Sequence, residues 1–305
     1  MSRKRPAILA LCTVIAVVGA GCGNDARENA SPPRDDSRAE GIESFEQPFQ
    51  GVEAYPVLVN SEITVGDNRV LMGLLDDSDA PIGSPKIDLE VDYYDLETST
   101  DDPVATDRPE FVWSVKNAFG VYVGDATFDR PGKWGAEVHI VGDGIDEKVK
   151  TSFEVQKEAS TPAIGEEVPA SDNLTGADVQ DLATISTDPK PDPRFYRHSV
   201  KSALKENEPF VVTFATPKFC QTAVCGPTLD IVKDVARDFP RLTFIHVEPY
   251  ELPAEPPDFK VVPSVKEWGL PSEPWVFVVN GDGTLNAKFE GVVGAAELAD
   301  TLEEL

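Results

Sequence analysis

The amino-acid sequence predicts two globular parts, a β-sandwich followed by an α/β domain, behind an export signal and a tether. From residue 87 to residue 93 apolar and acidic residues alternate, as in a strand with one buried and one wet face. Further along, the apolar run Val211–Phe214 predicts a buried strand, and Pro227 suits the first position of a following helix. The predicted segments are a signal peptide (1–22), a disordered tether (23–48), the sandwich (49–156), a linker (157–192) and the α/β domain (193–305).

The composition limits the class of partner. The chain has 305 residues, which is long enough for two domains that each bury a core. It carries 54 acidic and 27 basic residues, a formal net charge of -27. Because nucleic-acid binding needs a basic surface, this acidic excess argues against nucleic acid as a partner.

The N-terminal segment has the layout of an export signal. A basic start precedes an apolar run, residues 7–18, that is too short to span a bilayer of about 30 Å. Gly19-Ala20-Gly21-Cys22 resembles the lipobox of bacterial lipoproteins, although Gly19 stands where that family prefers leucine. The resemblance implies lipidation of Cys22 and a protein anchored to the cell membrane on its extracytoplasmic side. A plain cleaved signal and an uncleaved anchor are the alternatives. The following residues, 23–48, are too polar to form a core and predict a flexible tether.

The sandwich is predicted from several short strands separated by turns. Residues 149–155 alternate in polarity, and Gly142-Asp143-Gly144 is a turn signal. The passage Phe128 to Trp134, with its Pro131-Gly132 turn, resembles the late hairpin of bacterial immunoglobulin-like exported domains. This resemblance implies an all-β immunoglobulin-like sandwich. No metal site is expected here, since His139 has no second histidine or cysteine beside it.

The C-terminal segment resembles the thioredoxin-like superfamily in three passages. Val211–Phe214 followed by Cys225-Gly226-Pro227 resembles the strand and the Cys-Gly-Pro start of the thioredoxin active site. Glu273-Pro274-Trp275 resembles the loop that carries a cis-proline, and Gly291 resembles the glycine that closes a hairpin. The resemblance implies a thioredoxin-like α/β fold. The expected order is helix 194–206, strand 209–216, helix 227–239, strand 241–249, helix 264–269, strands 275–280 and 285–290, and helix 295–304.

This resemblance implies thiol–disulfide exchange on the thiols or disulfides of exported proteins, without a cofactor. Export permits a Cys220–Cys225 disulfide. The favoured attacking thiol is Cys225, because the N-terminus of the following helix stabilises its thiolate, and Cys220 would resolve the mixed disulfide; the reverse assignment is the alternative. Thr228 departs from the family, because it occupies the place of the usual second cysteine. The resemblance places Pro274 beside the reactive cysteine. It implies a partner-contact surface formed by Trp275, Gly226 and Pro227.

Three other functions use the same residues. A non-catalytic surface binding or scaffold lipoprotein would contain Cys220–Cys225 as a structural bond. A thiol peroxidase is disfavoured because Pro217, Thr222 and Cys225 do not have the peroxiredoxin spacing and no arginine follows Arg241. A copper-delivery protein is also disfavoured, because the cysteine spacing differs and His246 lies within a predicted strand.

Overall fold

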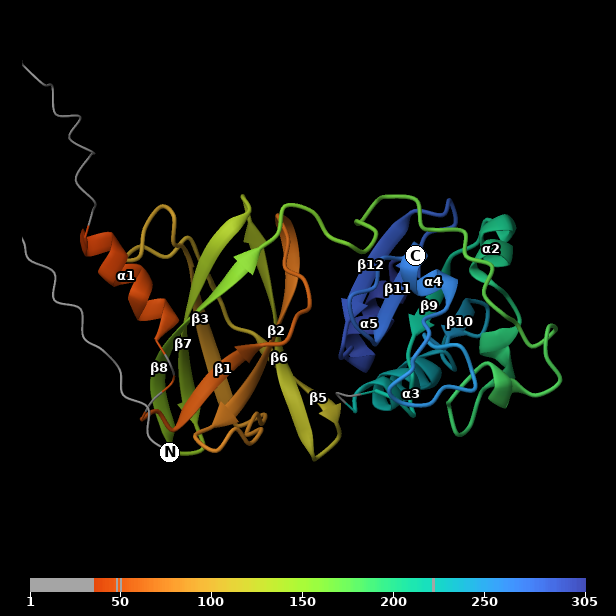
Figure 1. Cartoon of the computed structure of the whole chain (residues 1–305), viewed down its shortest axis with the longest axis horizontal. Coiled ribbons are helices and arrows are strands. Elements are labelled where there is room, and N and C mark those ends of the chain that lie inside the picture. Colours follow the sequence, from red (N-terminus) through yellow and green to blue (C-terminus); the bar gives the residue numbers. More distant parts are fainter. Residues whose placement is uncertain (1–35, 48, 50, 221–222) are drawn as a thin grey trace, which may run out of the picture. The chain divides into compact units, whose positions relative to one another are not determined.

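The strands gather into three four-stranded sheets within the part of the chain that the structure describes (Figure 1). The computed structural model describes residues 36–47, 49, 51–220 and 223–305. Residues 37–305 form one compact unit. Lipidation at Cys22 falls outside the described residues.

The first two sheets are antiparallel and share one apolar core. One has the order β1 (Ala54–Leu58), β2 (Gly66–Asp76), β6 (Phe119–Phe128), β5 (Glu110–Val115). The other has the order β4 (Ala105–Asp107), β3 (Ile87–Asp95), β7 (Gly132–Gly142), β8 (Ile145–Val155). The alternation in β3 buries Leu89, Val91 and Tyr93 in this core, where Phe128 packs edge-on against Trp134.

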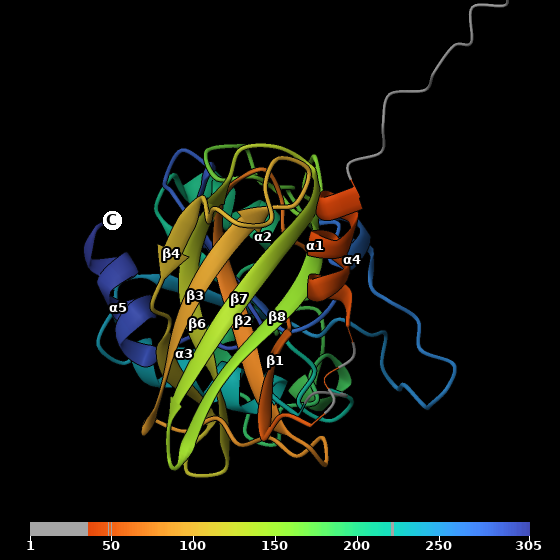
Figure 2. The ribbon, with the colours of Figure 1, turned by 90° about the vertical axis from the view of Figure 1, so that its left-hand side faces the viewer.

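A helix lies inside the segment predicted as a tether. This helix, α1 (Asp36–Glu46), runs beside β8 in Figure 2. Phe45 is 2% exposed and forms a small apolar cluster with Tyr94 and Leu96, which Ile42 also contacts. The sequence of α1 is otherwise polar, so the packing of Phe45 and Ile42 in this cluster is what stabilises the helix.

The third sheet is mixed and is covered by apolar side chains on both faces. Its order is β10 (Thr243–Val247), β9 (Phe210–Phe214), β11 (Trp275–Val279), β12 (Leu285–Glu290), and only the β9–β10 pair is parallel. The 11-residue helix α3 (Cys225–Val235) connects β9 to β10, and α5 (Ala295–Glu303) follows β12. Every residue of β9 and β11 is buried, which explains why Thr213 is the one hydroxyl residue in two otherwise apolar strands.

The remaining helices are short. They are α2 (Val200–Ala203), α4 (Pro263–Glu267) and the 3₁₀ helices η1 (Leu182–Thr184), η2 (Pro193–Tyr196) and η3 (Leu204–Glu206). The single helix expected over residues 194–206 is therefore divided. Ser199 is extended, and its hydroxyl caps a new start by accepting from the Ser202 amide, while Asn207 ends η3 in the left-handed conformation.

The proportion of secondary structure corrects the predicted fold class. The chain is mostly β-sheet with only 17% helix, so the assignment of an immunoglobulin-like sandwich followed by a thioredoxin-like α/β domain is wrong. The physical reason lies in the helices: α2 and α4 have four and five residues, little more than one turn each. Individual strands still fall where the apolar pattern predicted them, as in β9 and β11.

Polar contacts and an apolar cluster join the first sheet to the third. The Arg69 guanidinium of β2 pairs with Glu297 of α5 (Nε–Oε1 2.5 Å) and donates to the Val292 carbonyl oxygen at 2.7 Å. Leu71 and Val121 pack against Val292 and against Val224, the residue before α3. These contacts hold the α3 start against the β2–β6 pair.

Candidate functional site

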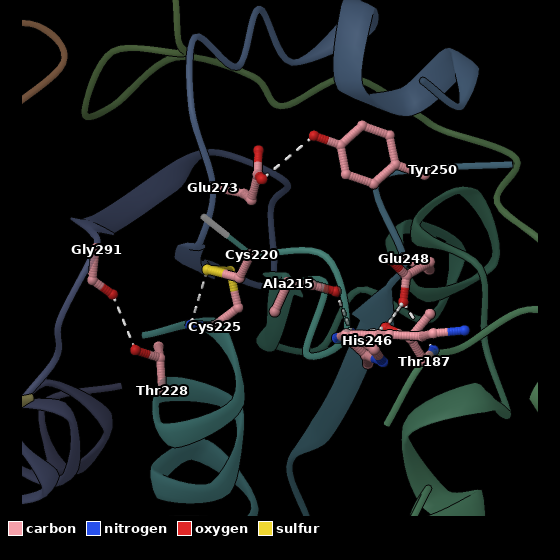
Figure 3. The surroundings of a disulfide bond; sticks show 11 residues. Thr187, Ala215, Cys220, Cys225, Thr228, His246, Glu248, Tyr250, Glu273 and Gly291 are labelled. Carbon is pink, nitrogen blue, oxygen red and sulfur yellow. Dashed lines mark hydrogen bonds between the residues drawn. A yellow bond between two sulfur atoms is a disulfide. The ribbon is translucent and has the colours of Figure 1, made fainter. Parts of the chain in front are cut away.

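The disulfide that the sequence indicated is present. Cys225 is the first residue of α3, and Cys220 lies in the loop after β9, with 5.9 Å between their Cα atoms (Figure 3). The Cys225 amide also donates a hydrogen bond to Cys220 Sγ at 3.3 Å. The bond and this contact close the loop directly in front of the helix.

One half of the disulfide is fully buried and the other half partly buried. Cys225 is 0% exposed and belongs to the apolar cluster that contains Val211 and Leu229. Cys220 is partly buried and packs against this cluster and against the one that contains Leu71. A bond placed between two apolar clusters is positioned to connect them.

Thr228 has a structural role at the position where a second cysteine was expected. Its buried hydroxyl donates to the Gly291 carbonyl oxygen at 3.0 Å. The Gly291 amide in turn donates to the Pro274 carbonyl oxygen at 2.8 Å, and Gly291 has a positive φ of 65° that favours glycine. Thr228 therefore ties α3 to the segment between β12 and α5.

The predicted partner-contact residues are unequally accessible. The Glu273–Pro274 peptide bond is cis, and Pro274 is buried. Trp275 is 2% exposed, stacks on Phe277 with 5.5 Å between ring centres, and donates its indole N–H to Ser272 Oγ at 3.2 Å. In the first turn of α3, Gly226 and Pro227 are partly exposed. Of the predicted contact residues, only these two reach solvent.

These observations correct the predicted redox-active centre. The disulfide exists, but it belongs to a chain that is mostly β-sheet, not to a thioredoxin-like α/β domain. A partner thiolate must reach a sulfur atom to attack it, and the side chain of Cys225 is inaccessible while that of Cys220 is only partly exposed. The prediction that the chain exchanges disulfides with exported proteins is therefore wrong, and the non-catalytic alternative fits better.

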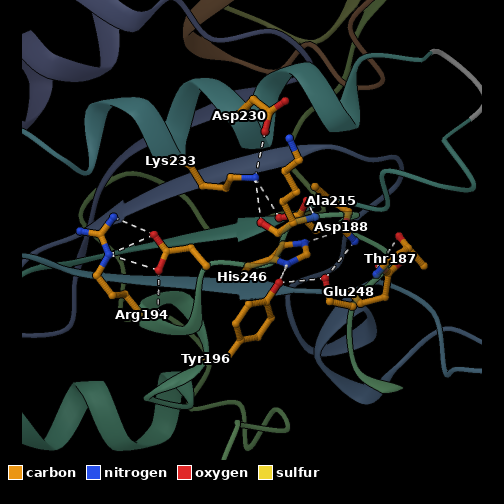
Figure 4. Close-up of polar contacts among 12 residues, drawn as sticks. Thr187, Asp188, Arg194, Tyr196, Ala215, Asp230, Lys233, His246 and Glu248 are labelled. Atoms are coloured by element: carbon orange, nitrogen blue, oxygen red, sulfur yellow. Dashed lines mark hydrogen bonds and ion pairs between the residues drawn. The ribbon is translucent and has the colours of Figure 1, made fainter. Parts of the chain in front are cut away.

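His246 is a buried structural residue. Its Nε2 lies 2.9 Å from the Ala215 carbonyl oxygen, which can only accept, so Nε2 carries the hydrogen (Figure 4). Its Nδ1 lies 2.7 Å from the Tyr196 hydroxyl, which donates to it. Burial lowers the pKa of His246 to about 4 and keeps the ring neutral. Both nitrogens are thus occupied, and no group of three metal-ligating side chains occurs among the described residues.

Sequence reasoning missed an acidic side chain directly after β10. Glu248 is 4% exposed, and its Oε2 accepts from the Thr187 amide at 2.8 Å and from the Thr187 hydroxyl at 2.6 Å. Burial raises the pKa of Glu248 above its usual value. Together with Tyr250 it lines a cavity at the carboxyl end of β10. The available signal was Glu248-Pro249-Tyr250-Glu251, a polar stretch placed immediately after a buried strand.

An aromatic cluster lies between that cavity and the disulfide loop. Phe219 packs on Phe259 with 5.2 Å between ring centres, and Phe259 packs on Tyr250 at 4.7 Å. The Tyr250 hydroxyl donates to Glu273 Oε1 at 3.2 Å. Burial beside Glu273 raises the pKa of Tyr250 to about 12. The three rings connect the loop before α3 with the loop after β10.

Comparisons with known proteins give no family for this chain. No protein-family model matches the sequence, and no curated protein matches it. A DUF4426 family protein from Pseudomonas aeruginosa is 9% identical over 37% of this chain and 97% of its own, with a TM-score of 0.26. The FdeC adhesin of Escherichia coli is 14% identical over 42% of this chain and 39% of its own, with a TM-score of 0.23. TM-scores this low carry no argument about function.

None of the helices in the described residues combines the length and the apolar character that crossing a membrane requires.

Proposed function

We propose that this protein is a non-catalytic binding or scaffold protein, held to the extracytoplasmic face of the cell membrane through a lipid on Cys22. In this function Cys220–Cys225 is a structural bond. The observation that carries the proposal is the complete burial of Cys225 within an apolar cluster. An inaccessible sulfur atom favours a bond that stabilises the fold over one that is exchanged with partners.

The disulfide stabilises the contact between α3 and the first sheet. It closes a loop between residues five apart, which lowers the entropy of the unfolded chain by an amount worth about 2 kcal/mol. The closed loop presents Val224 to Leu71 and Val121. The Arg69–Glu297 ion pair joins the same first sheet to α5, so the bond and the ion pair both support the packing of helices against this sheet.

Accessibility of the disulfide tests the proposal. The native protein is treated with dithiothreitol and iodoacetamide in buffer and in 8 M urea (about the concentration that unfolds small proteins), and the alkyl groups are counted by mass spectrometry. We expect Cys220 and Cys225 to be alkylated only in urea. Ala177→Cys provides an exposed control thiol that reacts in buffer, since Ala177 is exposed. Alkylation of the pair in buffer at the rate of the control would contradict a structural bond.

A further inference from the structure

A small cavity of about 160 Å³ lies at the amino end of β10, at the end of the third sheet that faces away from the disulfide loop. Its wall comes from two segments, one within residues 194–198 around η2 and one within residues 236–244 between the end of α3 and β10. Buried Phe195 and Phe244 pack on each other with 5.6 Å between ring centres and hold the two segments together. Sites for drug-sized molecules usually measure about 300–1,000 Å³, so this cavity suits a single small group.

The wall of this cavity is basic, in contrast to the chain as a whole. Its basic members are Arg194, Arg197, His198 and Arg241. No aspartate or glutamate is among the described residues that line it. The larger cavities beside Trp275 and at the carboxyl end of β10 each have four described carboxylates in their walls. In a chain with 54 acidic and 27 basic residues, the wall is therefore a local reversal of charge that attracts anions.

Arg197 and Arg241 are the two arginines of the wall without an ion pair. Both side chains are exposed, and neither guanidinium has a hydrogen-bond or carboxylate partner among the described residues. Every other arginine with a described side chain pairs with an aspartate or a glutamate; these are Arg69, Arg108, Arg130, Arg194 and Arg237. The two guanidinium groups that the protein leaves unpaired thus lie in one wall, where they are available to an anion from solution.

The other two basic side chains of the wall contribute less net charge. Arg194 pairs with Asp192 through Nε at 3.0 Å and Nη2 at 2.7 Å, and its Nη1 has no partner among the described contacts. The Nδ1 of His198 lies 3.3 Å from Glu206 Oε1. Because neither carboxylate lines the cavity, they offset Arg194 and His198 from outside the wall and leave the net positive charge on Arg197 and Arg241.

We propose that this cavity binds a terminal phosphate group between Arg197 and Arg241. A guanidinium fork engages two oxygen atoms, so two forks need at least three, which a terminal phosphate supplies and a carboxylate does not. Inorganic phosphate and the phosphate monoester of a lipid headgroup share this chemistry, and their relative affinities distinguish the two sources. The proposal goes beyond a scaffold role and does not depend on the disulfide or on a lipid at Cys22.

Isothermal titration calorimetry of the full chain, at physiological ionic strength so that weak surface attraction is screened, tests the ligand class. The probes are inorganic phosphate, dihexanoyl phosphatidic acid below the concentration at which it forms micelles, and acetate. We expect saturable one-to-one binding of a phosphate compound, and binding of acetate weaker by about tenfold or more, because acetate can engage only one fork.

The same titrations identify the source of the phosphate. Tighter binding of dihexanoyl phosphatidic acid assigns the site to a lipid headgroup, and tighter binding of inorganic phosphate assigns it to the free ion. Equal affinities assign it to the terminal phosphate group alone. Absence of saturable binding by both phosphate compounds, or binding of acetate as tight as theirs, would overturn the proposal.

Three variants locate the binding. Arg197→Gln and Arg241→Gln change exposed side chains, and each should weaken phosphate binding about tenfold through the loss of a charged donor. Arg237→Gln is the matched control, because it removes the same charge four residues before Arg241 from a side chain that is 69% exposed and does not line the cavity. It should change the affinity by less than about twofold. Wild-type affinity in both cavity variants, or an equal loss in Arg237→Gln, would refute this site.

Discussion

The Thr228 hydroxyl donates a hydrogen bond of 3.0 Å to the carbonyl oxygen of Gly291, 63 residues further along the chain. Both residues lie where α3, β11 and β12 meet, and the Gly291 amide continues the connection to Pro274. One buried side chain therefore links the helix that begins at the disulfide to the cis-proline segment. The following substitution measures the strength of this link.

Thr228→Val should lower the free energy of unfolding by about 1–2 kcal/mol. Valine has the same shape but cannot donate, so the Gly291 carbonyl loses its partner in a buried position. Thr228→Ser retains the hydroxyl and should recover most of this loss. Urea unfolding followed by circular dichroism measures both. Thr301→Val is a control, because the Thr301 hydroxyl donates to the Glu297 carbonyl oxygen within one partly exposed turn of α5. An equal loss of stability in Thr301→Val would show that the Thr228–Gly291 hydrogen bond does not stabilise the fold more than a bond within a single helix.

Arg69→Met should lower the free energy of unfolding by about 2 kcal/mol. The Arg69 side chain is 14% exposed, pairs with Glu297 through two nitrogens and donates to the Val292 carbonyl oxygen, so its removal deprives this carbonyl and the partly exposed Glu297 carboxylate of a charged donor. Arg108→Met removes an arginine of similar pairing that is 79% exposed, and should cost less than about 0.5 kcal/mol. The same unfolding measurement compares the two variants. Equal losses would show that the Arg69 contacts contribute no more to the free energy of unfolding than an exposed ion pair does.

The sequence located individual elements better than it located the fold. The pattern Val211–Phe214 predicted a strand, and β9 covers Phe210–Phe214; the start expected at Pro227 lies two residues inside α3. These elements follow local rules of polarity and helix capping. The fold class depends on how long the helices are and how the sheets pack, and the single helix expected over residues 194–206 did not form as one element.

The candidate sites show the same limit. Cys220 and Cys225 are close in sequence, so their pairing could be anticipated. The burial of Cys225 and Trp275 could not, because it depends on contacts with strands that are distant in the sequence. The cavity at the carboxyl end of β10 was missed for a related reason, because two of the residues that line it, Leu174 and Glu248, lie in separate segments that no spacing rule connects. Only folding places them in one wall.

Cys22→Ser should release the protein from the membrane. In the proposed function the lipid on Cys22 supplies the attachment, since each buried CH₂ of an acyl chain contributes about 0.8 kcal/mol. Detergent phase partitioning of cells grown with labelled palmitate measures both modification and attachment. We expect label and detergent-phase protein in the wild type and neither in Cys22→Ser. A labelled or membrane-bound Cys22→Ser variant would contradict lipidation at this residue.

Stability should fall as the pH is lowered from about 6.5 to about 4, in part because of His246. Burial lowers the pKa of this ring from 6.5 to about 4. Between these values the unfolded chain binds a proton that the folded chain does not, so acid favours unfolding, by roughly 3 kcal/mol at most for this group. Buried Glu248 and Glu290 act in the opposite sense, because their pKa values are raised and the folded chain retains their protons.

Substitution isolates the contribution of His246 from that of the carboxyl groups. His246→Gln retains an amide N–H for the Ala215 carbonyl and an oxygen toward Tyr196, but it does not titrate. We expect the free energy of unfolding of His246→Gln to fall less than that of the wild type between pH 6.5 and pH 4, measured by urea unfolding at each pH. Parallel pH profiles for the wild type and His246→Gln would show that His246 is not held neutral by the fold.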